Sequence, residues 1–433
     1  MFMKKTVFVH EFTDGILDPT QPMLGPVEDG GYIVANTTPG CWGPMITPEL
    51  KGCNEVTKPV YVEGAEVGDA IVIYIKSIKI TSQVSTSGTD QPVPGRFLDD
   101  PYVAAYCPKC DVFYPASEVK GIGIKAIKCK KCGEEISTFS MTNGYSIAFN
   151  EERNIGITLN KEMAEKVARD AKRYMAIPDT SIQHPAALIA PSNLAGMIAR
   201  TRPFLGQLGT APSTRIPDTH NSGDFGAFLF NTSHDYVMTE EELKKHKTDA
   251  HMDINLVREG TVVIAPVKVK GGGIYLGDAH AMQGNGEIAG HTTDVSALVV
   301  LRVKVLKGLN LDGPILLPLE EDLPHLAKPF NEAELRQAER LAKEWGMDKL
   351  EKTAPICFVG TGANLNAAID NALNRGSKCL GMSLEEFKNR ATITGSVDIG
   401  RAPGSVSVPL LIPIEVLEKV GLYDIIKEHY NLK

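Results

Sequence analysis

Hydrophobic and polar positions along the first third of the chain follow a pattern that predicts β-strands. Residues 5–10, 32–36 and 59–63 are short extended runs, and residues 69–81 form a longer run rich in Ile and Val. Partial alternation of β-branched and polar residues is typical of strands that place one face on a core. The next segment, 82–94, is rich in Ser, Thr, Gln and Pro, so we expect an exposed loop there.

The middle of the chain is predicted to combine helical, irregular and extended segments. Apolar positions at helical spacing predict an amphipathic helix over residues 161–175, and the charged segment 240–247 predicts a surface helix. A passage rich in Gly and Pro between them, 183–224, predicts no regular structure. Further strands are expected at residues 261–269, 273–280 and 296–306.

The C-terminal part is predicted to be helical. Asn331 with Glu334 resembles a capping box that starts a helix ending near Trp345, and Ser383 with Glu386 caps another helix. A further helix is expected over residues 363–373. Because the strands come mainly first and the helices mainly last, the pattern predicts a β-rich α+β fold, with helices packed against sheets rather than alternating with strands.

Composition and charge narrow the class of protein. The chain has 433 residues, of which 43% are hydrophobic and 23% charged, as is usual for globular proteins. Its formal charge of -8 argues against broad binding to nucleic acid or to anionic membranes, which favour a basic surface. It has no apolar run of membrane-helix length, and the apolar run near the N-terminus is too short for a signal peptide. We therefore expect a cytoplasmic protein with no membrane partner.

Four of the eight cysteines have the spacing of a zinc ribbon. Cys107 and Cys110 form one pair, Cys129 and Cys132 form another, and 18 residues lie between the pairs. Four thiolates at this spacing predict a structural Zn²⁺ in a reducing compartment. The segment 107–133 contains six lysines and two acidic residues, and four thiolates with one Zn²⁺ reduce that excess to about +2. A structural or oligomer-contact role is therefore favoured over contact with nucleic acid.

The stretch 273–290 carries the densest group of candidate catalytic side chains. Asp278, His280 and Glu287 lie within ten positions, separated by small residues and glycines. We expect the strand to end at Leu276 and the chain then to turn, which places these side chains on a loop at the end of the strand. Such groups can hold a metal or move protons. The alternative is a polar turn whose side chains bond the backbone.

Four segments, spread over nearly the whole chain, occur in the same order as in a known protein family. They are residues 59–69, the Gly-Thr-Ala-Pro segment within 205–213, the run Gly277-Asp-Ala-His-Ala-Met-Gln-Gly-Asn-Gly-Glu287, and the tail from Ser383-Leu-Glu-Glu to Val397-Asp-Ile. Together they resemble the acetamidase/formamidase family, metal-associated hydrolases of short linear amides. The resemblance implies β-sandwich or barrel units with flanking C-terminal helices. It also implies formamide or acetamide as the type of substrate.

The chain departs from the family pattern at three places. Asn285 stands where many members carry Asp, and the zinc ribbon is not a general family feature. The usual His-Gly-Gly-Asn-Met-Asp run is split between residues 220–223 and 251–253. His251 stands where the family usually has Asn, so it is either an added ligand or a neighbour of the site. These departures affect the identity of the substrate more than the type of chemistry.

The resemblance implies specific roles for the residues that match. A divalent metal, with zinc as the first choice, would be held by some of His220, Asp253, Asp278 and His280. Glu287 would carry the proton between water and the departing nitrogen, with His280 and Asp278 as its catalytic neighbours.

These expectations divide the chain into four parts. They are a β-rich N-terminal part at 1–105, the zinc ribbon at 106–136, a β-rich catalytic part at 137–310, and a helix-containing part at 311–433 packed on the catalytic core. We expect a homo-oligomer, most simply a twofold dimer. Two alternatives stay open from the sequence: a non-catalytic metal- or small-molecule-binding protein of the same fold, and a nucleic-acid-associated protein that uses the ribbon.

Overall fold

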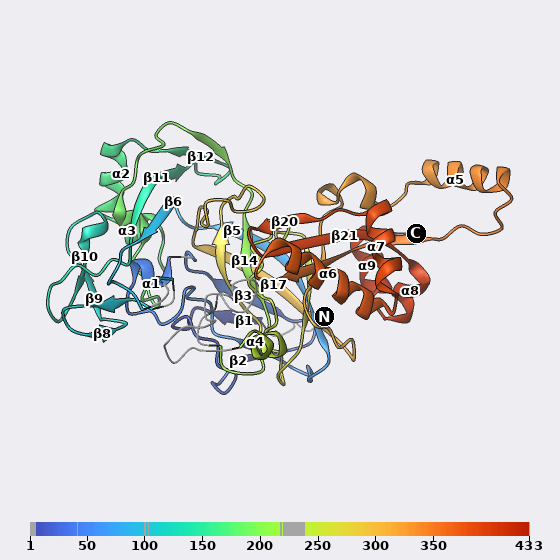
Figure 1. Ribbon diagram of the computed structural model, residues 1–433, viewed down its shortest axis with the longest axis horizontal. Coiled ribbons are helices and arrows are strands. Elements are labelled where there is room, and N and C mark those ends of the chain that lie inside the picture. The colour runs from blue at the N-terminus through green and yellow to red at the C-terminus, as the bar shows by residue number, and fades with distance from the viewer. Residues whose placement is uncertain are drawn as a thin grey trace.

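A nine-stranded sheet forms the centre of the molecule (Figure 1). The computed structural model describes residues 6–40, 42–98, 101, 102, 104–216, 219 and 239–432. All neighbouring strands of this sheet are antiparallel except the first pair, β1 and β3. In order across the sheet, the strands are β1 (Thr6–Val9), β3 (Tyr32–Asn36), β17 (Ala297–Leu306), β5 (Ala70–Ile80), β15 (Val262–Pro266), β18 (Ile315–Leu317), β19 (Thr353–Thr361), β21 (Ser405–Pro413) and β20 (Asp398–Arg401).

The central strands are apolar on both faces because both faces of the sheet are covered. In β5, the side chains of Ile71, Ile73 and Ile75 pack into one core, whereas Ala70 and Val72 pack into a second core on the opposite face. Successive side chains of a strand point to opposite faces, so a strand covered on both sides becomes an almost continuous apolar run. The sequence therefore predicted this strand nearly to its ends.

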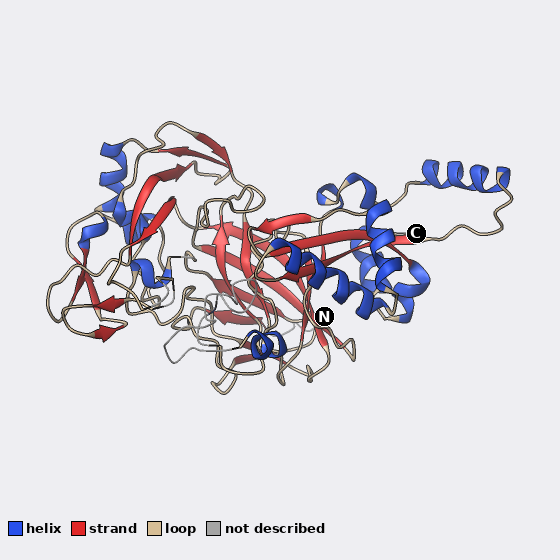
Figure 2. Ribbon diagram, viewed as in Figure 1, coloured by secondary structure: helices blue, strands red, loops and turns tan. Residues whose placement is uncertain are grey.

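Helices cover one face of the C-terminal half of the sheet, as Figure 2 shows. They are α6 (Leu365–Leu380), α7 (Leu384–Thr394), α8 (Ile414–Lys419) and α9 (Tyr423–Tyr430). The side chain of Ser383 accepts a hydrogen bond from the Glu386 amide and begins α7, as predicted. α6 begins after Asn364 and extends past the predicted end at residue 373. This arrangement confirms the prediction of a β-rich α+β fold.

Helix α5 (Glu332–Glu344) stands away from the rest of the molecule at the end of an extended connection (Figure 1). The predicted capping box is present: the Asn331 side chain accepts from the Glu334 amide, and the Glu334 side chain accepts from the Asn331 amide. No residue of this helix is buried, and Trp345 at its end is 79% exposed. The helix is amphipathic, and the leucines of its apolar side, Leu335 and Leu341, are exposed.

A smaller lobe carries a second sheet and the four ribbon cysteines. This sheet has the order β13-β12-β11-β6 and is flanked by short helices. Its strands are β6 (Val84–Pro92), β11 (Phe139–Phe149), β12 (Ile155–Thr158) and β13 (Ile198–Arg200). The ribbon strands are β7 (Tyr106–Cys107), β8 (Val112–Phe113), β9 (Ser117–Val119) and β10 (Ile127–Cys129). The helices are α1 (Gly43–Ile46), α2 (Lys161–Ala168) and α3 (Ala171–Tyr174).

Two sequence predictions fail in this lobe. The segment 82–94 is not an exposed loop: β6 pairs with β11, and its first five residues are buried. Its hydroxyl side chains are accommodated by hydrogen bonds, such as the contact of 3.0 Å between the Thr86 and Ser146 hydroxyls. The predicted helix 161–175 is interrupted between α2 and α3, where Asp170 leaves the helical conformation.

The passage 183–224 was predicted to be irregular, yet it includes β13 and a fully buried strand, β14 (Phe204–Gly209). β14 pairs with β16 (Tyr275–His280), and a further pair joins β2 (Leu24–Val27) to β4 (Val60–Val62). The predicted surface helix is α4 (Glu240–His246). No helix in the described part of the chain is long and apolar enough to cross a membrane. The large sheet contains strands from three of the four predicted parts, and the proposed division stays a prediction.

Candidate active site

The strand pair β14–β16 positions the candidate catalytic side chains. β16 runs through to His280, as the predicted strand 273–280 requires. The other expectation, a strand that ends at Leu276, is wrong, so Asp278 and His280 lie within a strand and not on a loop. Backbone pairing explains the difference, since Phe204 of β14 faces His280 and Leu205 faces Ala279. The loop begins only after His280, and Glu287 lies in it.

Four buried side chains converge at this strand pair. His251 Nε2 lies 2.9 Å from Asp253 Oδ2 and 3.2 Å from Asp278 Oδ2. His280 Nε2 lies 3.3 Å from Asp253 Oδ1 and 3.5 Å from Asp278 Oδ2. Two imidazole nitrogens and two carboxylates therefore face one another. We call these four residues the His/Asp cluster.

The spacing of these atoms suits a metal ion. Ligands at 2.0–2.2 Å from a tetrahedral zinc lie about 3.3–3.6 Å from each other, close to the separations of 2.9–3.5 Å in the His/Asp cluster. Histidine nitrogen with carboxylate oxygen is a ligand set that zinc accepts. The residues that are present therefore fit a divalent metal.

Gly206 in β14 leaves room at the centre of the His/Asp cluster. A Cβ atom at this position would lie 2.4 Å from Asp253 Oδ1, 2.5 Å from His280 Nε2 and 2.7 Å from Asp278 Oδ2. Gly40 approaches from another side, where a Cβ would lie 1.7 Å from Asp278 Oδ1. Any side chain at Gly206 would occupy the space that the atoms of the His/Asp cluster surround.

Asp294 fixes the orientation of His280. Its Oδ1 lies 2.8 Å from His280 Nδ1, and both residues are fully buried. A proton on Nδ1 shared with this carboxylate leaves Nε2 directed at the carboxylates of Asp253 and Asp278. A hydrogen bond from the second ring nitrogen to a carboxylate is usual for a histidine that binds a metal. Sequence reasoning missed Asp294, which lies after the turn in a segment with no motif of its own.

Arg401 joins Glu287 to the His/Asp cluster. Its Nε lies 3.3 Å from Glu287 Oε2, and its Nη1 donates to Asp253 Oδ2 at 3.1 Å. Backbone pairing brings these residues together, because the Gly286 amide donates to the Gly400 carbonyl and the Ala402 amide donates to the Gly286 carbonyl. Sequence reasoning also missed Arg401, which lies more than a hundred positions from Glu287.

Burial and neighbouring charges separate the protonation behaviour of these groups. Burial, the largest influence, raises the pKa of Glu287 well above its usual range, although Arg401 opposes this shift. Burial also acts on His280, but the Asp278 and Asp253 carboxylates outweigh it and raise the His280 pKa well above its usual range. Burial likewise opposes the shift of Asp253, whose pKa is held well below its usual range by His251 and Arg401. Acidic and basic groups with separated pKa values are characteristic of catalytic sites.

Three site residues have left-handed backbone conformations. The φ angles of Asp253, Asp278 and Glu287 are 48°, 52° and 41°. Residues other than glycine rarely adopt such angles, and strained backbone is concentrated at functional sites. All three of these carboxylates are buried.

The four ribbon cysteines lie together in the smaller lobe. Cys107 Sγ lies 3.7 Å from Cys132 Sγ, and Cys110 Sγ lies 4.0 Å from Cys129 Sγ. Sulfur atoms that bind one tetrahedral zinc at 2.3 Å are about 3.8 Å apart. The four thiols therefore fit a zinc ion, and no disulfide joins cysteines among the described residues.

Replacing Cys110 by serine is expected to remove one zinc ion per chain, because a serine hydroxyl does not replace a thiolate ligand. Metal analysis by mass spectrometry checks the zinc content, and thermal unfolding should occur at a lower temperature. Cys379→Ser is the matched control, since Cys379 lies outside the ribbon and is half-buried. Unchanged zinc content in Cys110→Ser would contradict a four-thiolate site.

The structure places most of the predicted site residues together. Asp253, Asp278 and His280 lie in the His/Asp cluster, and Glu287 is linked to it through Arg401. His251, for which the sequence left two roles open, lies within ion-pair distance of both Asp253 and Asp278. His220 lies outside the described residues, so its predicted role as a ligand stays a prediction.

Comparison with protein families accounts for nearly all of the chain. Residues 34–419 match the model of the acetamidase/formamidase family. The chain belongs to the acetamidase/formamidase family. It is accordingly an amidohydrolase that acts on amide carbon–nitrogen bonds, and the resemblance inferred from the sequence segments is confirmed. The site described above lies within the matched region.

Solved structures show that the fold is shared. A predicted acetamidase/formamidase from the thermophile Thermoanaerobacter tengcongensis is similar with a TM-score of 0.54 and 18% identity, over 97% of this chain and 99% of that chain. An acetamidase from Yersinia enterocolitica is similar with a TM-score of 0.53 and 15% identity, over 96% of this chain and 93% of that chain. No match was found among curated proteins.

Proposed function

We propose that this amidohydrolase hydrolyses a short linear amide, of the formamide or acetamide type, to a carboxylate and ammonia in a metal-dependent reaction. The observation that supports this most strongly is the His/Asp cluster around Gly206, where buried nitrogen and oxygen atoms surround a space kept open by a missing side chain. Relatives of the same fold are described as acetamidases, which agrees with a short amide as the substrate.

The proposed metal ligands are His251, Asp253, Asp278 and His280, with His220 as a further candidate. A divalent metal, preferably zinc, would polarise the amide carbonyl and ease the deprotonation of the attacking water. Asp294 would keep the His280 ring in place through its contact of 2.8 Å with Nδ1. Neither oxygen of the buried Asp278 carboxylate accepts a well-formed hydrogen bond from a described residue, which suits a group that faces a cation.

We propose Glu287 as the residue that moves the proton. An amine is a poor leaving group unless it is protonated, so amide hydrolysis needs a group that takes a proton from water and returns it to nitrogen. Glu287 is a buried carboxylate, and Arg401 connects it to Asp253 through contacts of 3.3 Å and 3.1 Å. Arg401 would act as a positioning residue that fixes the Glu287 carboxylate relative to the cluster.

Release of ammonia from formamide, acetamide, propionamide and urea, with and without a chelator, tests this function. We expect release from at least one short amide, its loss after prolonged chelation, and its recovery when zinc is restored. The Cys110→Ser protein separates the two metal sites, because its remaining metal would belong to the His/Asp cluster. Activity that survives complete removal of metal, verified by metal analysis, would overturn the metal-dependent mechanism.

We further expect a homo-oligomer, most simply a dimer, and a cytoplasmic location. The exposed amphipathic helix α5, with Leu341 and Trp345 at 56% and 79% exposure, agrees with assembly. Light scattering on the purified protein measures the oligomeric state, and a monomer at micromolar concentration would contradict it. The ribbon zinc is proposed to stabilise the smaller lobe, where Cys107 and Cys129 belong to the hydrophobic core.

A further inference from the structure

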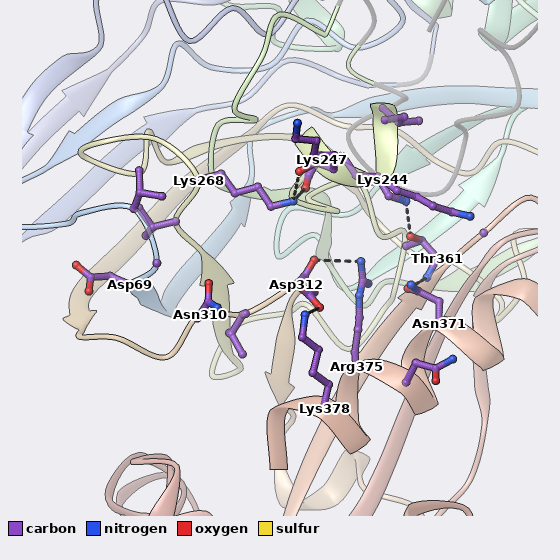
Figure 3. Close-up of a pocket in the computed structure, with 18 of the residues that line it drawn as sticks. Asp69, Lys244, Lys247, Lys268, Asn310, Asp312, Thr361, Asn371, Arg375 and Lys378 are labelled. Atoms are coloured by element: carbon purple, nitrogen blue, oxygen red, sulfur yellow. Dashed lines mark hydrogen bonds and ion pairs between the residues drawn. The ribbon is translucent and has the colours of Figure 1, made fainter. Parts of the chain in front are cut away.

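A second, separate cavity of about 600 Å³ opens between α4, the residues after β15, and α6 (Figure 3). Its volume lies within the range of small-molecule sites. None of the residues that we assign to the catalytic site lines it. We call it the lysine pocket because of the basic side chains in its wall: Lys244, Lys245, Lys247, Lys268, Arg375 and Lys378.

The lysine pocket carries a large excess of positive charge. Its six basic side chains face two acidic ones, Asp69 and Asp312, within the lining. The buried carboxylate of Asp249, just beneath, contacts Lys247 and Arg375, which leaves an excess of three positive charges. Concentrated charge of one sign in a concave site attracts ligands of the opposite charge.

The floor of the pocket is fixed by a buried ion-pair network. Lys247 Nζ lies 2.8 Å from Asp249 Oδ1 and donates to Thr361 Oγ1 at 2.8 Å. The Arg375 guanidinium contacts Asp249 and donates to the carbonyl oxygens of Val359 at 3.0 Å and Asp312 at 3.2 Å. These contacts hold Arg375 against the protein, so it is not free to form a two-pronged pair with a ligand carboxylate.

Lys268 is the basic group most suited to a ligand. Its ammonium donates to the backbone carbonyl oxygens of Lys245, at 3.1 Å, and of Lys247. Among the residues that the structure describes, no carboxylate lies within ion-pair distance of it. Burial, partly offset by the charge of Asp249, lowers the pKa of Lys268. A positive charge that is costly in the free protein becomes favourable when an anion binds beside it.

Helix α6 forms one wall of the lysine pocket, and this wall favours an anionic ligand. Asn371, Asn374 and Lys378 line the cavity, and their spacing of three and four residues places them on one side of the helix. The chain that enters α6, through Gly362 and Ala363, also lines it. The Asn364 side chain caps the start of this 16-residue helix, and its first turn contains no acidic residue, so no carboxylate offsets the positive end of the helix dipole.

We propose that the lysine pocket binds a small phosphomonoester. Asp249 holds Arg375 and Lys247, and Asp312 pairs with Lys378, so the basic group best placed for a ligand is the ammonium of Lys268. A lysine ammonium binds phosphate as a point charge. A dianionic phosphate matches an excess of three positive charges better than a single carboxylate does. The cavity is larger than one phosphate, and Leu243, Val267 and Leu311 give it an apolar side that would contact an organic part. This inference does not depend on the amide substrate.

Calorimetric titration of the metal-loaded protein tests the proposal, with ribose 5-phosphate, inorganic phosphate, ribose and citrate as probes at constant ionic strength. We expect saturable binding of ribose 5-phosphate, weaker binding of inorganic phosphate and no binding of ribose. Lys268→Gln should weaken the binding of ribose 5-phosphate by roughly tenfold or more, since it removes a charged donor. Lys378→Gln should weaken it by a smaller factor.

Lys388→Gln is the matched control, because it removes the same charge from exposed helix α7 and does not line the pocket. Since Lys268 also bonds two carbonyl oxygens, Lys378 gives a second variant: its exposed ammonium pairs with the Asp312 carboxylate, and its removal breaks no such bond to the backbone. The proposal is overturned if neither phosphate probe binds, if citrate binds in preference to them, or if both pocket variants bind like the control.

Discussion

Replacing Glu287 by glutamine is expected to reduce turnover of the amide by about 10²- to 10⁴-fold while the His/Asp cluster keeps its metal. Glutamine has the shape of a protonated glutamate but cannot accept a proton from water. Because burial already raises the Glu287 pKa, the protonated form is well tolerated in this environment, and we expect the variant to fold. Ammonia release measured at saturating substrate, together with metal analysis, checks the result.

The control for this variant is Glu63→Gln, which makes the same chemical change at an exposed position. It should have normal turnover and metal content. Near-normal turnover of Glu287→Gln would remove Glu287 from the proposed mechanism. Loss of metal in that variant, with the fold intact, would instead assign Glu287 to metal binding.

The Gly206→Ala variant is expected to lose the metal of the His/Asp cluster and at least about 100-fold in activity. The added methyl group would lie 2.4–2.7 Å from one atom each of Asp253, His280 and Asp278, so these side chains must move apart or the space between them must be filled. β14 has an extended backbone at this position, so alanine itself is not strained. Metal analysis and ammonia release measure the two effects.

A second glycine gives a control for the Gly206→Ala variant. A Cβ at Gly284, in the loop that leads to Glu287, would meet nothing within 4 Å, and Gly284 does not have a positive φ. Gly284→Ala should therefore retain metal and activity. Retention of metal by a folded Gly206→Ala protein would show that the metal does not occupy the space in front of Gly206, and the proposed ligand set would be wrong.

The sequence predicted elements whose signals are local. The strand 69–81 was evident because its first half is buried on both faces and is almost entirely apolar, and the starts of α5 and α7 were evident from Asn331 and Ser383. β6 and β14 were missed because both contain Gly, which is depleted in strands, and β6 also contains Asp and Pro. Their pairing partners and burial, which decide the outcome, lie far away in the sequence.

The same division holds for the candidate site. Asp278, His280 and Glu287 are close in sequence and could be identified together. Asp294 and Arg401 reach the site only through the bridges that pair His280 with Asp294 and Gly286 with Arg401. A single Asp or Arg without a motif gives no local signal, so only the topology of the chain could have identified them.

The pairing of Arg401 with the loop that carries Glu287 has a consequence for synthesis. Every other residue assigned to the site lies before position 295, but the group that holds Glu287 lies in β20, at the edge of the large sheet. A ribosome must therefore translate past residue 401 before an arrangement that holds this glutamate can form. Incomplete chains that end before β20 would contain the His/Asp cluster but would still lack the contact that holds Glu287.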